Sequence, residues 1–105
     1  MLLCVIGEQS RMLSVVSEKD GDTVYIHADL EGIQKLESCI ANLKRELENN
    51  ECPHDHLMSK SWGSDELTET MLDSERSDGC VQVHHVKLYG WNQEWALKHG
   101  LQEDA

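Results

Sequence analysis

Apolar positions recur every three or four residues between positions 30 and 48, which is the period of one face of an α-helix. The stripe consists of Ile33, Leu36, Ile40, Leu43 and Leu47. Asp29 stands where an N-cap is expected, and Pro53 cannot continue a helix. The pattern therefore predicts one long helix over residues 30–48 that ends near Asn49-Asn50 and turns its stripe towards the core.

A β-hairpin is predicted ahead of this helix. Residues 12–18 are rich in β-branched side chains, and residues 23–28 alternate between apolar and polar positions. Asp20-Gly21, between them, is a dipeptide typical of tight hairpin turns. An apolar run at residues 2–6 precedes the hairpin and is compatible with either a buried strand or an edge strand.

The sequence after the helix predicts further strands. Residues 54–62 alternate as a strand that Gly63 would end. Residues 65–72 fit either a strand or a turn of helix, and we favour the strand. A polar loop, residues 73–79, would then lead into a long β-type run over residues 80–91 and complete a second hairpin.

The apolar side chains of the run over residues 80–91 change from one face to the other in its middle. A bulge at His84-His85 would return all four aliphatic side chains to the core face, and we favour it; a strand covered on both faces is the alternative. Beyond the run, Asn92 and Gly100 suit the two ends of a short C-terminal helix.

The order of these elements defines the expected fold class. We predict an α+β protein: a single antiparallel β-sheet, built from two hairpins with four to five strands, and one long helix packed on one face. A chain of 105 residues has the size of one domain, so residues 1–105 are expected to form a single domain.

The composition adds that the protein is strongly acidic. Its 20 Asp and Glu residues oppose 9 Lys and Arg residues, which gives a formal net charge of −11 at pH 7. Such a charge opposes binding to nucleic acids and to anionic membranes and favours a basic partner, although it is equally compatible with a role in solubility alone. No secretory signal and no apolar stretch of about 20 residues is visible, so we expect a cytoplasmic protein.

The histidines are the main candidates for metal ligands. His54 and His56 would share one face of a strand, and His84 and His85 lie on a run that could pair beside them, so these four residues define an alternative function as a small metal-binding protein or enzyme. Neither a C-x-x-C nor an H-E-x-x-H spacing occurs, so we favour a histidine pair that is solvated or at the edge of the core, and we expect no cofactor. No glycine-rich phosphate loop, nucleophile elbow or dinucleotide fingerprint occurs either, which favours a protein that is not an enzyme.

The segments HDHLMSKSWGSDELTE and VHHVKLYGW together resemble the bacterial polymorphic-toxin immunity family known as immunity protein thirty-two. The residues that carry the resemblance are His56, Leu57, Met58, Trp62, Gly63, Leu67, Thr68, His85, Val86, Lys87, Leu88 and Tyr89. The resemblance covers roughly the second half of the chain, with one glycine after Trp62 where the family has two. It implies a non-enzymatic protein that binds a cognate bacterial toxin and blocks it, and it assigns no catalytic residue. A purely structural role of the same residues, in the core and in a turn at Gly63, is the alternative.

The expected contact surface is the densest acidic stretch of the chain. It carries Asp65, Glu66, Glu69, Asp73, Glu75 and Asp78. These side chains would occupy the site at which a basic toxin holds its own substrate, commonly the phosphates of a nucleic acid. A mobile, solvated hairpin tip is the alternative for this stretch, and a structural subunit that assembles through exposed tryptophans is a further possibility for the chain.

Overall fold

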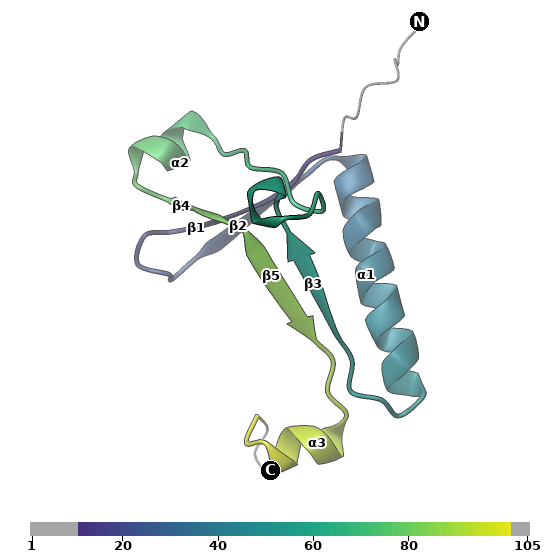
Figure 1. The fold of residues 1–105 in the computed structure, drawn as a ribbon. Helices are drawn as coiled ribbons and strands as arrows, with labels where there is room; N and C mark the ends of the chain where they lie inside the picture. Colours follow the sequence, from purple (N-terminus) through teal and green to yellow (C-terminus); the bar gives the residue numbers. More distant parts are fainter. Residues whose placement is uncertain (1–10, 102–105) are drawn as a thin grey trace, which may run out of the picture.

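Two antiparallel sheets and one long helix make up most of the computed structural model, which describes residues 11–101 (Figure 1). The strands of the first sheet, in the order β2-β1-β4, are β1 (Leu13–Ser17), β2 (Val24–Ala28) and β4 (Val81–Val83). The strands of the second sheet are β3 (His54–Met58) and β5 (His85–Tyr89). The predicted α+β class, the antiparallel pairing and the long helix are confirmed, but the strands are divided between two sheets instead of forming one. The expected strand at residues 2–6 lies outside the described residues.

The N-terminal hairpin is confirmed. β1 and β2 pair antiparallel with Val15 opposite Ile26, and Gly21 adopts a φ of 81° in the turn, a conformation that glycine enters without strain. The backbone N–H of Glu18 donates to the carbonyl of Thr23 at 2.9 Å and closes the turn. This register turns the apolar positions of β2 towards the second sheet.

The long helix also lies where the apolar stripe predicts it. α1 spans Leu30–Glu48, and the side chain of Asp29 caps it by accepting a hydrogen bond from the N–H of Gly32 at 2.8 Å. Gly32 faces the start of β1, where a Cβ atom would lie 1.9 Å from the carbonyl oxygen of Met12. The helix approaches the sheet this closely only because residue 32 has no side chain.

The apolar stripe of α1 is only partly buried. Cys39 and Leu43 pack into the core, whereas Ile33 and Ile40 remain 44% and 51% exposed. The expectation that the whole stripe faces the core is therefore wrong for these two isoleucines. β3 packs against α1, and Leu36 of α1 lines an open cleft between the two sheets.

The expected second hairpin is wrong. β4 pairs with β1, and β5 pairs with β3, so neither part of the run over residues 80–91 pairs with residues 65–72. One isolated bridge joins Leu67 to Ser59, and the N–H of Thr68 donates to the carbonyl of Leu13 at 2.8 Å. The segment is thus held to the sheets by single hydrogen bonds instead of a ladder.

Two shorter elements replace parts of the predicted strands and loops. β3 ends at Met58, and a 3₁₀ turn, η1 (Lys60–Trp62), leads to Gly63 at a φ of 101°. The turn expected at Gly63 is confirmed, in a conformation that favours glycine. The predicted polar loop at residues 73–79 contains a short helix, α2 (Asp73–Ser77).

The last β-type run passes from one sheet to the other, so the predicted bulge is wrong. Val83 ends β4 in the first sheet, Val86 lies in β5 of the second sheet, and His84 stands between them outside both strands. Because the chain changes sheet here, Val83, Val86 and Leu88 all pack against the core, as predicted for a bulge. The fourth aliphatic side chain, Val81, is 55% exposed.

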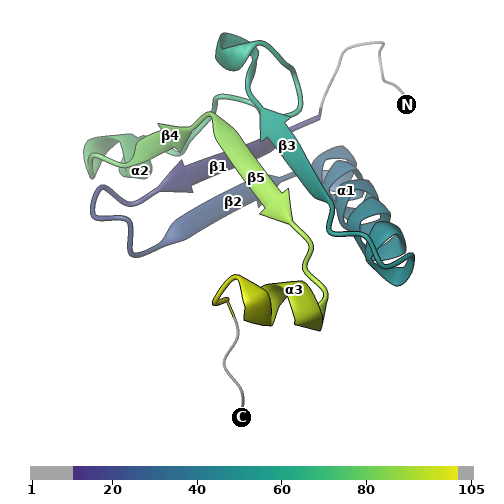
Figure 2. The same cartoon turned by 60° about the horizontal axis from the view of Figure 1, so that its bottom comes forward.

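The core lies where the two sheets and α1 meet (Figure 2). Its buried cluster consists of Leu13, Val15, Cys39, Leu57 and Leu67. α3 (Gln93–Lys98) follows β5, and Asn92 caps it as predicted by accepting a hydrogen bond from the N–H of Trp95 at 2.9 Å. No helix within residues 11–101 combines the length and the apolar composition that crossing a membrane requires.

Candidate functional site

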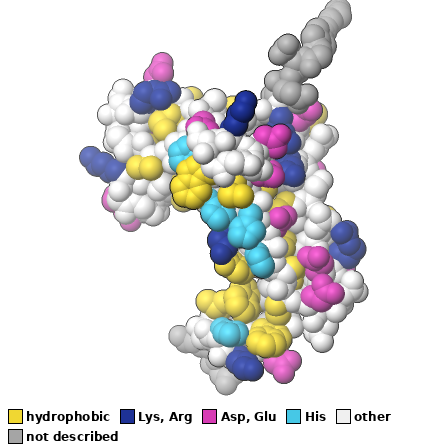
Figure 3. Space-filling view, in the orientation of Figure 1, with side chains coloured by type: hydrophobic (Ala, Val, Ile, Leu, Met, Phe, Trp, Pro, Cys, Tyr) yellow, Lys and Arg dark blue, Asp and Glu magenta, His cyan; other side chains and the backbone are white. Residues whose placement is uncertain are grey.

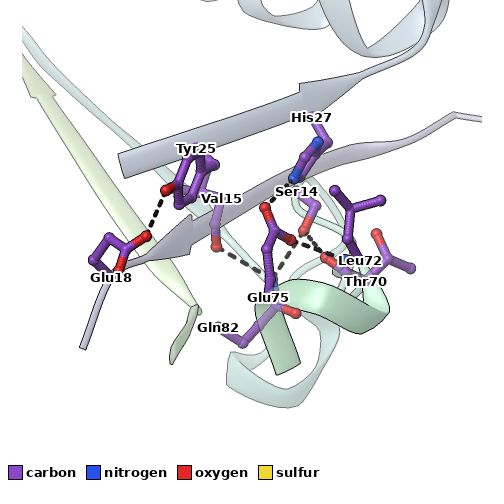
Figure 4. Close-up of polar contacts among 9 residues, drawn as sticks. All are labelled: Ser14, Val15, Glu18, Tyr25, His27, Thr70, Leu72, Glu75 and Gln82. Carbon is purple, nitrogen blue, oxygen red and sulfur yellow. Dashed lines mark hydrogen bonds and ion pairs between the residues drawn. The ribbon is translucent and has the colours of Figure 1, made fainter. Parts of the chain in front are cut away.

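Glu75, one of the six predicted contact residues, has a structural role. It is only 7% exposed, and its carboxylate accepts a hydrogen bond from the N–H of Leu72 at 2.8 Å and lies 2.7 Å from Nε2 of His27 (Figure 4). Burial alone would raise the pKa of Glu75, but the hydrogen bonds from Leu72 and His27 outweigh burial and hold that pKa below its usual value. The carboxylate therefore fixes the start of α2 against β2 and is not available to a partner.

Glu66 and Glu69 are also engaged within the protein. Glu66 accepts hydrogen bonds from the hydroxyl of Ser64 and from the N–H of Met58, the latter at 3.0 Å. Glu69 accepts from the N–H and the hydroxyl of Ser61 at 2.9 and 2.8 Å. These hydrogen bonds lower the pKa of both carboxyl groups, with the Ser64 hydroxyl the main cause at Glu66 and the Ser61 N–H at Glu69. Both side chains thus hold the turn around η1 in place.

The remaining three predicted contact residues, Asp65, Asp73 and Asp78, are exposed. Polar contacts with residues of β1 and β2 fasten the segment that carries them to the first sheet (Figure 4). The hydroxyl of Ser14 donates to the carbonyl of Thr70, and the amide of Gln82 donates to that hydroxyl oxygen at 2.9 Å. With Glu75 buried within it, this stretch packs on the first sheet and does not form the predicted hairpin.

The residues that carry the family resemblance converge on β3, η1 and β5. His56 lies opposite Lys87 and Leu57 opposite Val86 in the β3–β5 pair. Leu57 is a buried core residue, whereas Trp62 is 57% exposed above the same sheet. The motif is therefore one structural unit with a buried apolar face and an exposed face of rings.

Three of the four candidate metal ligands lie together on the exposed face of β3 and β5. Nδ1 of His56 lies 2.8 Å from Nε2 of His85, at hydrogen-bond distance, and the ring of His54 meets that of His56 edge-on at 5.0 Å. The ring of His84 instead stacks on Trp62, and its Nδ1 lies 2.8 Å from the hydroxyl of Ser59. Desolvation and the neighbouring His54, His85 and Lys87 lower the pKa of His56. Among residues 11–101, no three His, Cys, Asp or Glu side chains are placed to share a metal ion.

These histidines belong to a continuous row of ring contacts, which we call the ring band. Successive ring centroids lie 5.0 to 6.1 Å apart. Its members are Trp62, His84, His85, His56, His54, Tyr89, Trp91, His99 and Trp95. Figure 3 shows it as neighbouring yellow and cyan side chains that run along β3 and β5 to α3. The band could not be predicted from the sequence, because it depends on the pairing of β3 with β5; the rings at positions 54, 56, 85 and 89 were its only local signal.

Neither Cys39 nor Cys80 is an activated nucleophile. Burial and a hydrogen bond from its Sγ to the carboxylate of Asp55, at 3.0 Å, raise the pKa of Cys39 to about 11. Burial and nearby carboxylates, Glu18 first among them, also raise the pKa of Cys80. Both groups remain thiols at neutral pH, which is the less reactive form.

No protein-family model, no curated protein and no solved structure matches this chain. The resemblance to immunity protein family thirty-two therefore stays a prediction.

Proposed function

We propose that this protein is a non-enzymatic immunity protein that acts in the cytoplasm, where it binds a basic cognate toxin and blocks it. The resemblance carried by β3, η1 and β5 suggests the class of protein. The net charge of −11 favours a basic partner and fast, electrostatically steered association.

The observation that supports a recognition surface is the fixation of the acidic segment on the first sheet. The buried Glu75–His27 contact and the Ser14–Thr70 hydrogen bond hold α2 and its flanks in one arrangement. A surface that is already ordered loses less conformational entropy when it binds, so more of the contact energy appears as affinity. Exposed charges on such a surface set the association rate and the register of the partner.

Three exposed carboxylates make up the proposed contact surface: those of Asp65, Asp73 and Asp78. They would pair with Lys and Arg side chains with which the toxin holds its own substrate, commonly the phosphates of a nucleic acid. The protein would then inhibit by occupying that site. Glu66, Glu69 and Glu75 serve the proposal only by holding the segment in place.

The test is the association rate of the protein with the toxin encoded by the neighbouring gene, measured by stopped flow at several salt concentrations. Replacing Asp65, Asp73 and Asp78 with serine should slow association at low salt and reduce the dependence of the rate on ionic strength. Folding should be unchanged, because exposed charges contribute little to stability. Glu75 is left intact, since its loss would disturb α2.

A control variant separates local contact from overall charge. Replacing the exposed Glu37, Glu48 and Glu51 with serine also removes three negative charges, but from α1 and the residues that follow it. The control should keep most of the wild-type rate and most of its salt dependence. Equal rates and equal salt dependence for the two triple variants would exclude the acidic segment as the contact surface.

A further inference from the structure

An open apolar cleft lies between the two sheets. It has a volume of about 300 Å³ and opens between β2, α1 and the inner face of β5. The lining side chains are apolar apart from His85, and they include Val24, Ile26, Leu36, Val86 and Leu88. Soluble monomers rarely expose large contiguous apolar patches, so an open apolar cleft of this size marks a surface suited to an interaction.

The rim of the cleft consists of side chains that the sequence pattern marks as core. Val24 and Ile26 alternate on the inner face of β2, yet they are 55% and 56% exposed. Ile33 and Ile40, which stand on either side of Leu36 in the apolar stripe of α1, are also 44% and 51% exposed. Within residues 11–101, eight apolar side chains are buried while eleven large ones stay exposed. A single chain therefore leaves the apolar face of β2 and part of the apolar stripe of α1 open to water.

The outer edge of β2 is also unpaired among the described strands. β2 stands at one end of the strand order β2-β1-β4 and is therefore an edge strand of the first sheet (Figure 2). Natural proteins blunt exposed edge strands with charged residues, proline or bulges. β5 follows this rule with Lys87, whereas the sequence of β2, Val-Tyr-Ile-His-Ala, contains no Lys, Arg, Asp, Glu or Pro. This edge is therefore suited to pair with another strand.

We propose that a second copy of this chain occupies the cleft and pairs its β2 antiparallel with β2 of the first copy about a two-fold axis. An identical strand is self-complementary in such a pair. Because β2 has no Lys, Arg, Asp or Glu, the pairing sets no two of these charged side chains opposite each other, even though each chain has a net charge of −11. A basic toxin, in contrast, would be drawn to the acidic surface and not to this one.

The exposed apolar area fits the centre of a dimer interface. Four aliphatic side chains that are about half exposed present on the order of 200 Å² of apolar surface per chain. Leu36, Val86 and Leu88 in the walls of the cleft add to this area. A stable dimer buries roughly 800 Å² per chain, with its apolar part concentrated at the centre. The cleft and its rim supply that centre, and the β2 edge supplies backbone hydrogen bonds around it.

The experiment is sedimentation velocity of the full chain under reducing conditions, with Val24→Asp and Val81→Asp as matched variants. Val24 and Val81 are both valines at 55% exposure, and both pair with Ser17 of β1, from opposite sides. Only Val24 lies in the cleft. The wild type and Val81→Asp should sediment as dimers of about 24 kDa, twice the chain mass of 12.0 kDa, whereas Val24→Asp should sediment as a monomer.

A second measurement keeps the test decisive if Val24→Asp fails to fold. The melting temperature of a wild-type dimer rises with protein concentration, because association stabilises only the folded state. A wild-type chain that stays monomeric at about 100 µM and melts independently of concentration would overturn the proposal. A monomer of this kind is expected if another segment of this chain, or another protein, fills the cleft. A dimer that persists in a folded Val24→Asp variant would also overturn it. The proposal does not rest on toxin binding.

Discussion

Gly32→Ala tests whether close approach between α1 and β1 shapes the fold. In an ordinary helix interior, replacing glycine with alanine stabilises by about 1 kcal/mol. Here the new Cβ would lie 1.9 Å from the carbonyl oxygen of Met12, whereas real Cβ atoms stay beyond 3.0 Å, so helix and strand must separate by about 1.1 Å. The obstacle is backbone, and the same carbonyl accepts a hydrogen bond from the N–H of Asp29 at 3.1 Å. The strand can therefore yield little.

The expected result is a net loss of stability. Overpacking typically destabilises by about 1–3 kcal/mol and occasionally by more, and a backbone obstacle places Gly32→Ala at or above the upper end. After the gain in helix propensity, about 2–3 kcal/mol of destabilisation should remain. For a chain of this size, that loss lowers the melting temperature by at least about 8 °C.

Thermal unfolding followed by circular dichroism, at one fixed protein concentration, measures this change. Ser38→Ala is the control, because Ser38 is an exposed position of the same helix and should change the melting temperature little or raise it slightly. A Gly32→Ala variant that melts at or above the wild-type temperature would refute the close approach of α1 to β1.

Three further predictions concern buried or clustered groups. Glu75→Gln should lower the urea midpoint at pH 7. Because the pKa of Glu75 in the folded state lies below its unfolded value, the ionised carboxylate stabilises the protein above about pH 4.5, and this stabilisation is lost as the pH falls through the folded pKa. The urea midpoints of variant and wild type should therefore converge in acid, whereas an Asp78→Asn control should differ little from the wild type at either pH. Cys39 should resist iodoacetamide at pH 8 until denaturant is added, whereas the exposed Cys52 should be alkylated at once, as peptide mapping would show; early labelling of Cys39 would contradict its burial against Asp55. The double variant His54→Ala, His56→Ala should melt within a few degrees of the wild type, with or without chelator, and stoichiometric zinc or iron that is lost in this variant would instead favour a metal-binding function.

The first half of the fold was predictable because its signals are local. The Asp20-Gly21 turn, the alternation in β2 and the cap at Asp29 each specify structure within a few residues. The stripe of α1 likewise predicts the helix and its bounds, Leu30–Glu48. It could not predict which side of the stripe β3 covers, because that depends on how the two sheets cross.

The second half was predicted less well because its contacts join distant residues. Segment 65–72 is held by hydrogen bonds to β1 across more than 50 positions, such as the one between Thr68 and Leu13. Strand alternation cannot reveal such contacts. β5 instead pairs with β3, which leaves the predicted hairpin without its partner strand.

The candidate site shows the same limit at the level of single side chains. In the sequence, Glu75 and Asp78 are equivalent members of an acidic stretch. In the structure, Glu75 is buried against His27, which lies 48 positions earlier in the chain, and Asp78 is exposed. Charge counting therefore found the acidic surface but could not separate the carboxylates that hold it from those that face a partner.

Protection of living cells tests the proposed role most directly. Bacteria that produce the proposed cognate toxin should stop growing, and co-production of this protein should restore their growth. The variant with serine at positions 65, 73 and 78 should protect less at an equal cellular level, whereas the variant with serine at positions 37, 48 and 51 should protect as the wild type does. Cells that gain no protection from a folded wild-type chain would contradict the proposed immunity function.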